Sequence, residues 1–131
     1  MRPFDELVEE ANAADVTGWG FDWLAGRAYE ERPPWGYARL LSQRLAAAEC
    51  ALDIDTGGGE VVNEAPALPP LTVVTESWPP NVRRAKATLS PRGVRVVKTT
   101  LGDPLPFDRE SFDLVTSRHP VSPNFAEIPA F

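Results

Sequence analysis

Apolar residues recur with a helical period in the first third of the chain. Phe4, Leu7 and Val8 fall at i, i+3 and i+4 with acidic residues between them, which predicts a short amphipathic helix. Residues 35–48 follow a pair of prolines and carry an apolar stripe, which predicts a longer helix. The stripe consists of Tyr37, Leu40, Leu41 and Leu45. We therefore assign residues 1–34 to an N-terminal helical extension and residues 35–131 to a second domain.

The pattern changes near residue 50 to short and nearly continuous apolar runs. Four such runs lie at residues 51–54, 71–75, 94–99 and 112–116. Helix-like stretches separate the first three runs, and the clearest of them is 81–89. Strands that alternate with helices require right-handed crossovers and a parallel sheet, and continuous apolar strands fit a sheet that is covered on both faces. The predicted fold class is therefore α/β, with a mostly parallel sheet and helices on both faces.

Composition and charge exclude several classes of function. The chain has 131 residues and a net charge of -6, which argues against a nucleic-acid partner because such binding needs a basic face. Cys50 is the only cysteine and His119 the only histidine, so neither an intrachain disulfide nor a structural zinc site is expected. No apolar run approaches the roughly 18 residues that cross a bilayer, and the N-terminus lacks a signal-peptide core. We expect a cytoplasmic protein with no membrane partner and no metal.

Candidate chemistry gathers where the first two predicted strands end. Gly57, Gly58 and Gly59 follow the first strand, and Glu76 ends the second about 20 residues later. Glycines let backbone N–H groups approach a ligand closely, and an acid at this position accepts ribose hydroxyls. A flexible turn would explain the glycines alone. The order of strand, glycines, helix, strand and acid predicts a nucleoside-type ligand.

Three motifs follow one another along the chain: residues 52–60 (Leu-Asp-Ile-Asp-Thr-Gly-Gly-Gly-Glu), Glu76, and 105–107 followed by 111–115. Their order and spacing resemble those of the class I S-adenosylmethionine-dependent methyltransferases, in particular the methyltransferase-domain group. The resemblance covers about residues 35 to 128. It implies a Rossmann-like sheet of strand order 3-2-1-4, S-adenosylmethionine as the cofactor, and a small-molecule methyl acceptor.

The resemblance also implies roles for individual residues. Asp53 and Gly57–Gly59 would hold the methionine moiety, Glu76 the ribose, Ser77 and Trp78 the adenine, and the segment around Gly102 and Asp103 would close its far side. A carboxylate suits the ligand's ammonium group, and an aromatic ring offers a stacking face. Two alternatives stay open: Asp53 could brace the glycine turn, and Trp78 could be a surface residue fixed by the two prolines after it.

The sequence departs from the family pattern at two points. Asp55 occupies the family's first glycine position, and it adds a side chain and a negative charge beside the methionine site, so we count it among the cofactor-binding candidates. The loop before residue 105 is short, so the family's adenine-binding acid corresponds either to Asp103 or to no residue. His119 follows the fourth strand at the rim and is the candidate general base, with a plain loop residue as the alternative. Methyl transfer itself requires no base if donor and acceptor are held in line.

Family members continue beyond the fourth strand to a seven-stranded sheet. We therefore expect a methyltransferase truncated after that strand, or a short relative, that binds the cofactor weakly or not at all and has little or no activity by itself. The run 112–116 would become an exposed edge, which we expect to be covered by a second copy of the chain, as a homodimer, or by the N-terminal helices. A non-catalytic interaction module that uses this open edge is the second hypothesis. A nicotinamide-dependent dehydrogenase ranks third, because its glycine spacing is missing.

Overall fold

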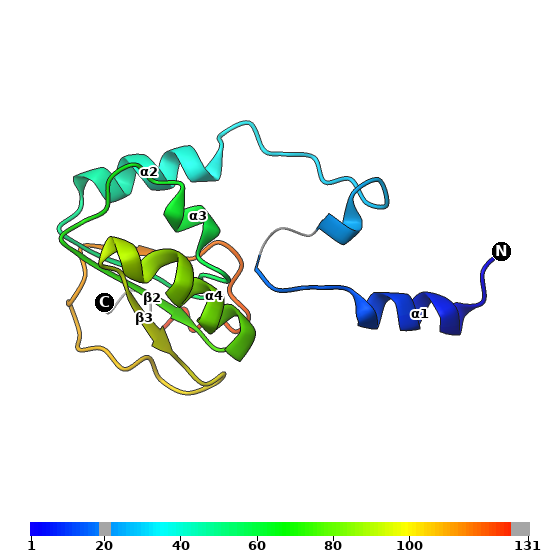
Figure 1. The fold of residues 1–131 in the computed structure, drawn as a ribbon. Helices are drawn as coiled ribbons and strands as arrows, with labels where there is room; N and C mark the ends of the chain where they lie inside the picture. The colour runs from blue at the N-terminus through cyan, green and yellow to red at the C-terminus, as the bar shows by residue number, and fades with distance from the viewer. Residues whose placement is uncertain (19–21, 127–131) are drawn as a thin grey trace.

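A four-stranded parallel sheet forms the centre of the molecule. The computed structural model describes residues 1–18 and 22–126 (Figure 1). The strands are β1 (Cys50–Asp53), β2 (Leu71–Glu76), β3 (Arg95–Lys98) and β4 (Leu114–Thr116), and their order in the sheet is β3-β2-β1-β4. Every pairing between neighbours is parallel. The predicted α/β class and the strand order 3-2-1-4 are confirmed.

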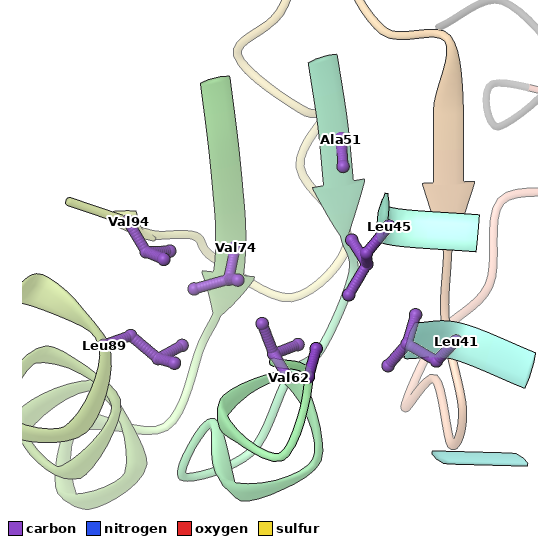
Figure 2. Packing of buried hydrophobic residues seen from close by; sticks show 8 residues of the cluster. Leu41, Leu45, Ala51, Val62, Val74, Leu89 and Val94 are labelled. Atoms are coloured by element: carbon purple, nitrogen blue, oxygen red, sulfur yellow. The ribbon is translucent and has the colours of Figure 1, made fainter. Parts of the chain in front are cut away.

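Three helices pack on one face of this sheet. They are α2 (Tyr37–Ala47), α3 (Glu60–Asn63) and α4 (Pro79–Leu89), which continues into the 3-10 turn η2 (Ser90–Arg92). Prolines at the start of α4 fit the first helical turn, because N–H groups there have no acceptor within the helix and a proline lacks only that group. The helices and strands share one buried cluster (Figure 2), formed by Leu41, Leu45, Ala51, Val62, Ala65, Val74, Leu89 and Val94. This cluster fixes the helices against β1 and β2, and so fixes the loops that connect them.

The opposite face of the sheet is covered by a loop where the sequence led us to expect a helix. Leu52, Ile54 and Val73 are buried on this face. Leu105, Phe107 and Phe112 pack against them from the segment between β3 and β4, together with Leu71, Val97 and Val115. The rings of Phe107 and Phe112 meet edge to face, with centroids 5.2 Å apart. Aromatic burial therefore holds this loop beside the ends of the strands.

The carboxylate of Asp113, just before β4, binds the backbone at the start of the neighbouring strand β1. Asp113 accepts hydrogen bonds from the backbone N–H groups of Glu49 and Cys50, each at 2.9 Å. These two bonds lower the pKa of Asp113. The acid thus joins the start of β1 to the start of β4.

The N-terminal extension projects away from the sheet (Figure 1). The predicted amphipathic helix is present as α1 (Phe4–Ala13), has no buried residue, and is followed by the 3-10 turn η1 (Asp22–Leu24). Glu10 of α1 forms ion pairs with Arg2, at 2.5 Å, and with Arg27. The extension also reaches α4, because the Gly18 N–H donates to Oδ1 of Asn81 at 2.7 Å. Across the described residues, no helix has the length and apolar character needed to span a membrane.

Candidate functional site

The carboxylate that ends β2 is joined to the glycine loop after β1. Oε2 of Glu76 accepts a hydrogen bond from the Gly57 N–H at 2.9 Å. Oε1 accepts from the N–H groups of Ser77 and Trp78, each at 2.9 Å. Glu76 is only 5 % exposed, so these three backbone groups replace the water that the charge would otherwise require. The structure brings together the acid and the glycine loop that the sequence predicts as neighbours.

Each of the three glycines has its own structural reason. Gly57 and Gly59 have φ of +68° and +82°, which favour a residue without Cβ. A Cβ on Gly59 would lie 2.6 Å from Cδ1 of Leu89, so this glycine also lets α4 pack closely. A Cβ on Gly58 would meet the Glu60 carboxylate and the Arg84 side chain, which form an ion pair at 2.9 Å. The loop is therefore closely covered by α4.

Asp53 ends β1 in a poorly solvated position. Burial raises its pKa to about 6, while hydrogen bonds from the hydroxyls of Thr116 and Thr56 act in the opposite direction. The bond from Thr116 Oγ1 to Asp53 Oδ1 measures 2.7 Å. The negative charge of Asp55 raises the pKa further. Sequence reasoning missed Thr116, whose only signal is a hydroxyl at the last position of a strand.

A small cavity of about 10 Å³, roughly the size of one water molecule, adjoins Asp53. Its lining consists of Tyr37, Leu41, Asp53, Asp55, Thr56, Val61 and Arg118. The guanidinium carbon of Arg118 lies 5.6 Å from the centroid of the Tyr37 ring, within range of a cation–π contact. A carboxyl group and a guanidinium thus line one confined space.

Tyr37 brings a phenol to this cavity from the first turn of α2. Burial raises its pKa to about 12, as does the charge of Asp53, whereas the charge of Arg118 lowers it. The Tyr37 hydroxyl is buried, and no described residue completes a hydrogen bond to it. The Thr116 hydroxyl nearby donates instead to Asp53. The sequence indicated Tyr37 only as a member of an apolar stripe, so its position at this cavity was missed.

A larger cavity of about 330 Å³ lies beside the ends of β1 and β3. Its residues come from the end of β1, the segment after β3 and the segment after β4: Ile54, Asp55, Thr99, Thr100, Leu101, Gly102, Asp103, Leu105, Ser122, Pro123, Asn124 and Phe125. The volume is near the lower limit for small-molecule sites. Gly102 and Asp103 both line this cavity, and their place beside the adenine stays a prediction.

Asp55 stands between the two cavities in a left-handed conformation. Its φ is +55°, a region that aspartate tolerates better than most residues with a Cβ. Its N–H donates to Oγ1 of Thr75 at 3.2 Å, and its Oδ2 accepts from the Val121 N–H at 2.9 Å. The side chain thus ties the segment after β4 to the loop after β1.

Seven predicted site residues lie outside both cavities: Gly57, Gly58, Gly59, Glu76, Ser77, Trp78 and His119. Ser77 and Trp78 form the entry to α4, and Trp78 is 40 % exposed beside the Glu76 carboxylate. His119 is exposed after β4 and lines neither cavity. Within residues 1–18 and 22–126, no three histidine, cysteine or acidic side chains are grouped as metal ligands. The catalytic role of His119 and the adenine-binding role of Ser77 and Trp78 stay predictions.

Comparison with known proteins places this geometry in a family. The profile of the family described as "Methyltransferase domain" matches residues 52–128. The chain is similar to the solved YcgJ protein from Bacillus subtilis, with 26% identity over 63% of this chain and 38% of that chain, at a TM-score of 0.49. It is also similar to a "putative methyltransferase" from Bacillus halodurans C-125, with 28% identity over 62% of this chain and 37% of that chain, at a TM-score of 0.50.

No curated protein sequence matches the chain. The chain spans well under half the length of the two solved proteins. The family profile nevertheless covers more than half of the chain and includes the glycine loop, Glu76 and β4. The chain therefore belongs to the methyltransferase-domain family.

Proposed function

We propose that this chain carries the cofactor-binding part of an S-adenosylmethionine-dependent methyltransferase acting on a small molecule. The observation that carries the proposal is the contact between Glu76 and Gly57, which brings an acid and a side-chain-free backbone together at the ends of adjacent strands. Families of this fold bind nucleoside cofactors at this edge of the sheet. The cavity of about 330 Å³ begins beside the same edge, at Ile54 and Asp55.

The small cavity suits the amino-acid end of the cofactor. Asp53 offers a carboxylate to an ammonium group, and Arg118 offers a guanidinium to a carboxylate. An ammonium group bound beside Asp53 would favour its ionised form, which burial disfavours in the free protein. Arg118 and Tyr37 would have to move outward, since the cavity has room for only about one water molecule.

The rest of the cofactor would lie along the ends of the strands. Glu76 would face the ribose, and the segment that contains Gly102 and Asp103 would enclose the adenine within the larger cavity. When bound, S-adenosylmethionine supplies an activated methyl group. The residues of the chain bind and orient it, and His119 stands at the rim as the candidate base for an acceptor hydroxyl.

Calorimetric titration with S-adenosylhomocysteine tests the proposal. We expect saturable binding that is weakened about tenfold or more by Arg118→Ala and less by Arg118→Lys, which keeps the charge. 5′-Methylthioadenosine, which lacks the amino-acid part, should bind the wild-type chain and Arg118→Ala equally. Nicotinamide adenine dinucleotide serves as the control for the dehydrogenase hypothesis. Saturable binding of that dinucleotide together with no binding of S-adenosylhomocysteine would refute the proposal.

A second candidate function is association through β4. Among the described residues, this strand pairs only with β1, and its other edge has no strand partner. Unpaired edges bind further strands, including those of a second copy of the chain. Light scattering during size exclusion tests a homodimer. A monomeric mass at about 100 µM protein would exclude self-association as the role of this edge.

A further inference from the structure

Asp55 is the only described residue that lines both cavities. The small cavity contains Asp53 and Arg118, and the larger one contains Gly102 and Asp103. A ligand that places its amino-acid end in the first and its adenosyl end in the second must pass Asp55. In S-adenosyl compounds, the atom that joins these two ends is sulfur. The side chain at residue 55 is therefore placed to face that sulfur.

The carboxylate of Asp55 is held in this position by its own bonds. Its backbone N–H donates to Thr75 Oγ1, and Oδ2 accepts from the Val121 N–H. No hydrogen bond to Oδ1 is found in the described part of the chain, so one oxygen remains available. The charge also reaches the small cavity, where it contributes to the raised pKa of Asp53.

The larger cavity has an acidic character on its other side as well. Among the described residues, the two ionisable ones in its lining are both acids, Asp55 and Asp103. Arg118 lines the small cavity, where its guanidinium lies over the Tyr37 ring. A positive charge at the junction of the cavities would therefore meet carboxylates, and no cation among the described residues that line the larger cavity would compete for them.

We propose that Asp55 is a specificity-determining residue that favours the positively charged sulfonium of the methyl donor over the neutral thioether of the product. The inference rests on the proposed function above. The glycine that the family resemblance expects at residue 55 has no side chain for this purpose. The attraction is selective because the donor and the product differ in charge at the sulfur that faces Asp55. The product is therefore held less tightly than the donor.

Calorimetry with three ligands tests this inference on the whole chain. The ligands are S-adenosylmethionine, sinefungin, which carries an ammonium group in place of the sulfonium, and the neutral S-adenosylhomocysteine. The wild-type chain should bind the two cations about tenfold more tightly than the neutral ligand. Asp55→Asn keeps the shape and an acceptor oxygen but removes the charge, and it should bring the three affinities to within about threefold. Asp55→Gly should do the same.

The outcomes separate the inference from the proposed function. An unchanged preference in a folded Asp55→Asn overturns the inference and leaves the proposed function standing. A failure of all three ligands to bind the wild-type chain overturns both. If the variants do not fold, the test is the salt dependence of the ligand preference of the wild-type chain. The preference should shrink about threefold or more from about 0.02 M to about 0.5 M salt, and a preference that is constant over this range overturns the inference.

Discussion

The carboxylates that end β1 and β2 have contrasting surroundings. Both oxygens of Glu76 already accept hydrogen bonds, from three backbone N–H groups at 2.9 Å each. Asp53 has hydroxyl partners, one of them Thr116 at 2.7 Å, and burial raises its pKa to about 6. Backbone N–H groups cannot move without moving the loop, whereas a desolvated acid gains from any cation that reaches it. The first carboxylate joins the glycine loop to the start of α4, and the second is a desolvated acid.

The largest expected effect is on the Glu76 side of this comparison. Glu76→Ala leaves the N–H groups of Gly57, Ser77 and Trp78 without their acceptor, and should lower the free energy of unfolding by about 3–5 kcal/mol. Urea denaturation measures the loss. The matched variant Glu76→Gln keeps one acceptor oxygen and should cost about 1–2 kcal/mol. A loss below about 1 kcal/mol for the alanine variant would mean that the bracing role is wrong.

The next effect tests how closely the glycine loop is packed. Gly59→Ala adds a Cβ at a φ of +82° and 2.6 Å from the Leu89 side chain, and should cost about 2–4 kcal/mol in thermal or urea unfolding. Gly93 is the control, because its φ is +79° and no atom lies within 4 Å of the added Cβ. Gly93→Ala should therefore cost only the backbone strain, about 1 kcal/mol. Equal losses in the two variants would show that Leu89 yields without cost.

Replacing the Asp53 carboxylate should raise the free energy of unfolding at neutral pH, whereas the Glu76 and Gly59 variants lower it. The reason is that the ionised form of Asp53 destabilises the fold. Its pKa is raised in the folded chain, so the folded state binds the proton more tightly than the unfolded state. Its contribution therefore becomes less favourable as pH rises from about 4 to about 6, by on the order of 2 kcal/mol. Asp53→Asn should remove this dependence and be more stable than the wild type at pH 8, in urea denaturation. Asp5→Asn, on the exposed part of α1, is the control variant.

Subtracting the Asp53→Asn curve from the wild-type curve removes the contributions of the other titrating groups. If the remaining free energy of unfolding rises between about pH 4 and about pH 6, the raised pKa of Asp53 is wrong. A carbon-detected titration of the Asp53 carboxyl gives the same answer without unfolding. Its midpoint should fall when a cationic adenosyl ligand is added, since the ligand's ammonium favours the ionised acid.

The smallest effect concerns the ion pair that covers the glycine loop. Arg84 and Glu60 meet at 2.9 Å, but their side chains remain 43% and 28% exposed. A double-mutant cycle with Arg84→Met and Glu60→Gln should give a coupling of roughly 0.5 kcal/mol, which salt reduces. A coupling above about 2 kcal/mol would mean that the pair, and not Glu76 alone, holds the loop.

The strands were predictable because each has a local signal, whereas their order followed from the family resemblance. The apolar runs at 51–54 and 71–75 correspond to β1 and β2 within one residue, and the stretch 81–89 lies within α4. The run 112–116 was too long for β4, which begins at Leu114. Phe112 packs on the second face, and Asp113 binds the start of β1. Both residues therefore contact segments that are distant in the sequence, and the local pattern of apolar residues does not indicate such contacts.

The candidate site was predictable only in part for the same reason. Glu76 and Gly57 were recognised by their spacing along the chain. Tyr37, Thr116 and Arg118 reach Asp53 from α2 and from the end of β4, and these contacts depend on how distant segments pack. Asp55 was recognised as a departure from the family pattern, but its bond to Val121 follows from the course of the chain after β4.

The bond between Asp113 and the start of β1 has a consequence for how the protein is made. The N–H groups of Glu49 and Cys50 receive their acceptor from a residue 63 or 64 positions later in the chain. On the ribosome, α2, β2 and α4 can begin to pack as they emerge. Strand β1, however, pairs with its second neighbour only when β4 has left the exit tunnel. Such distant contacts slow folding, since a long loop must close before they form. Nascent chains arrested before residue 113 should therefore expose the strand edge of β1 to chaperones.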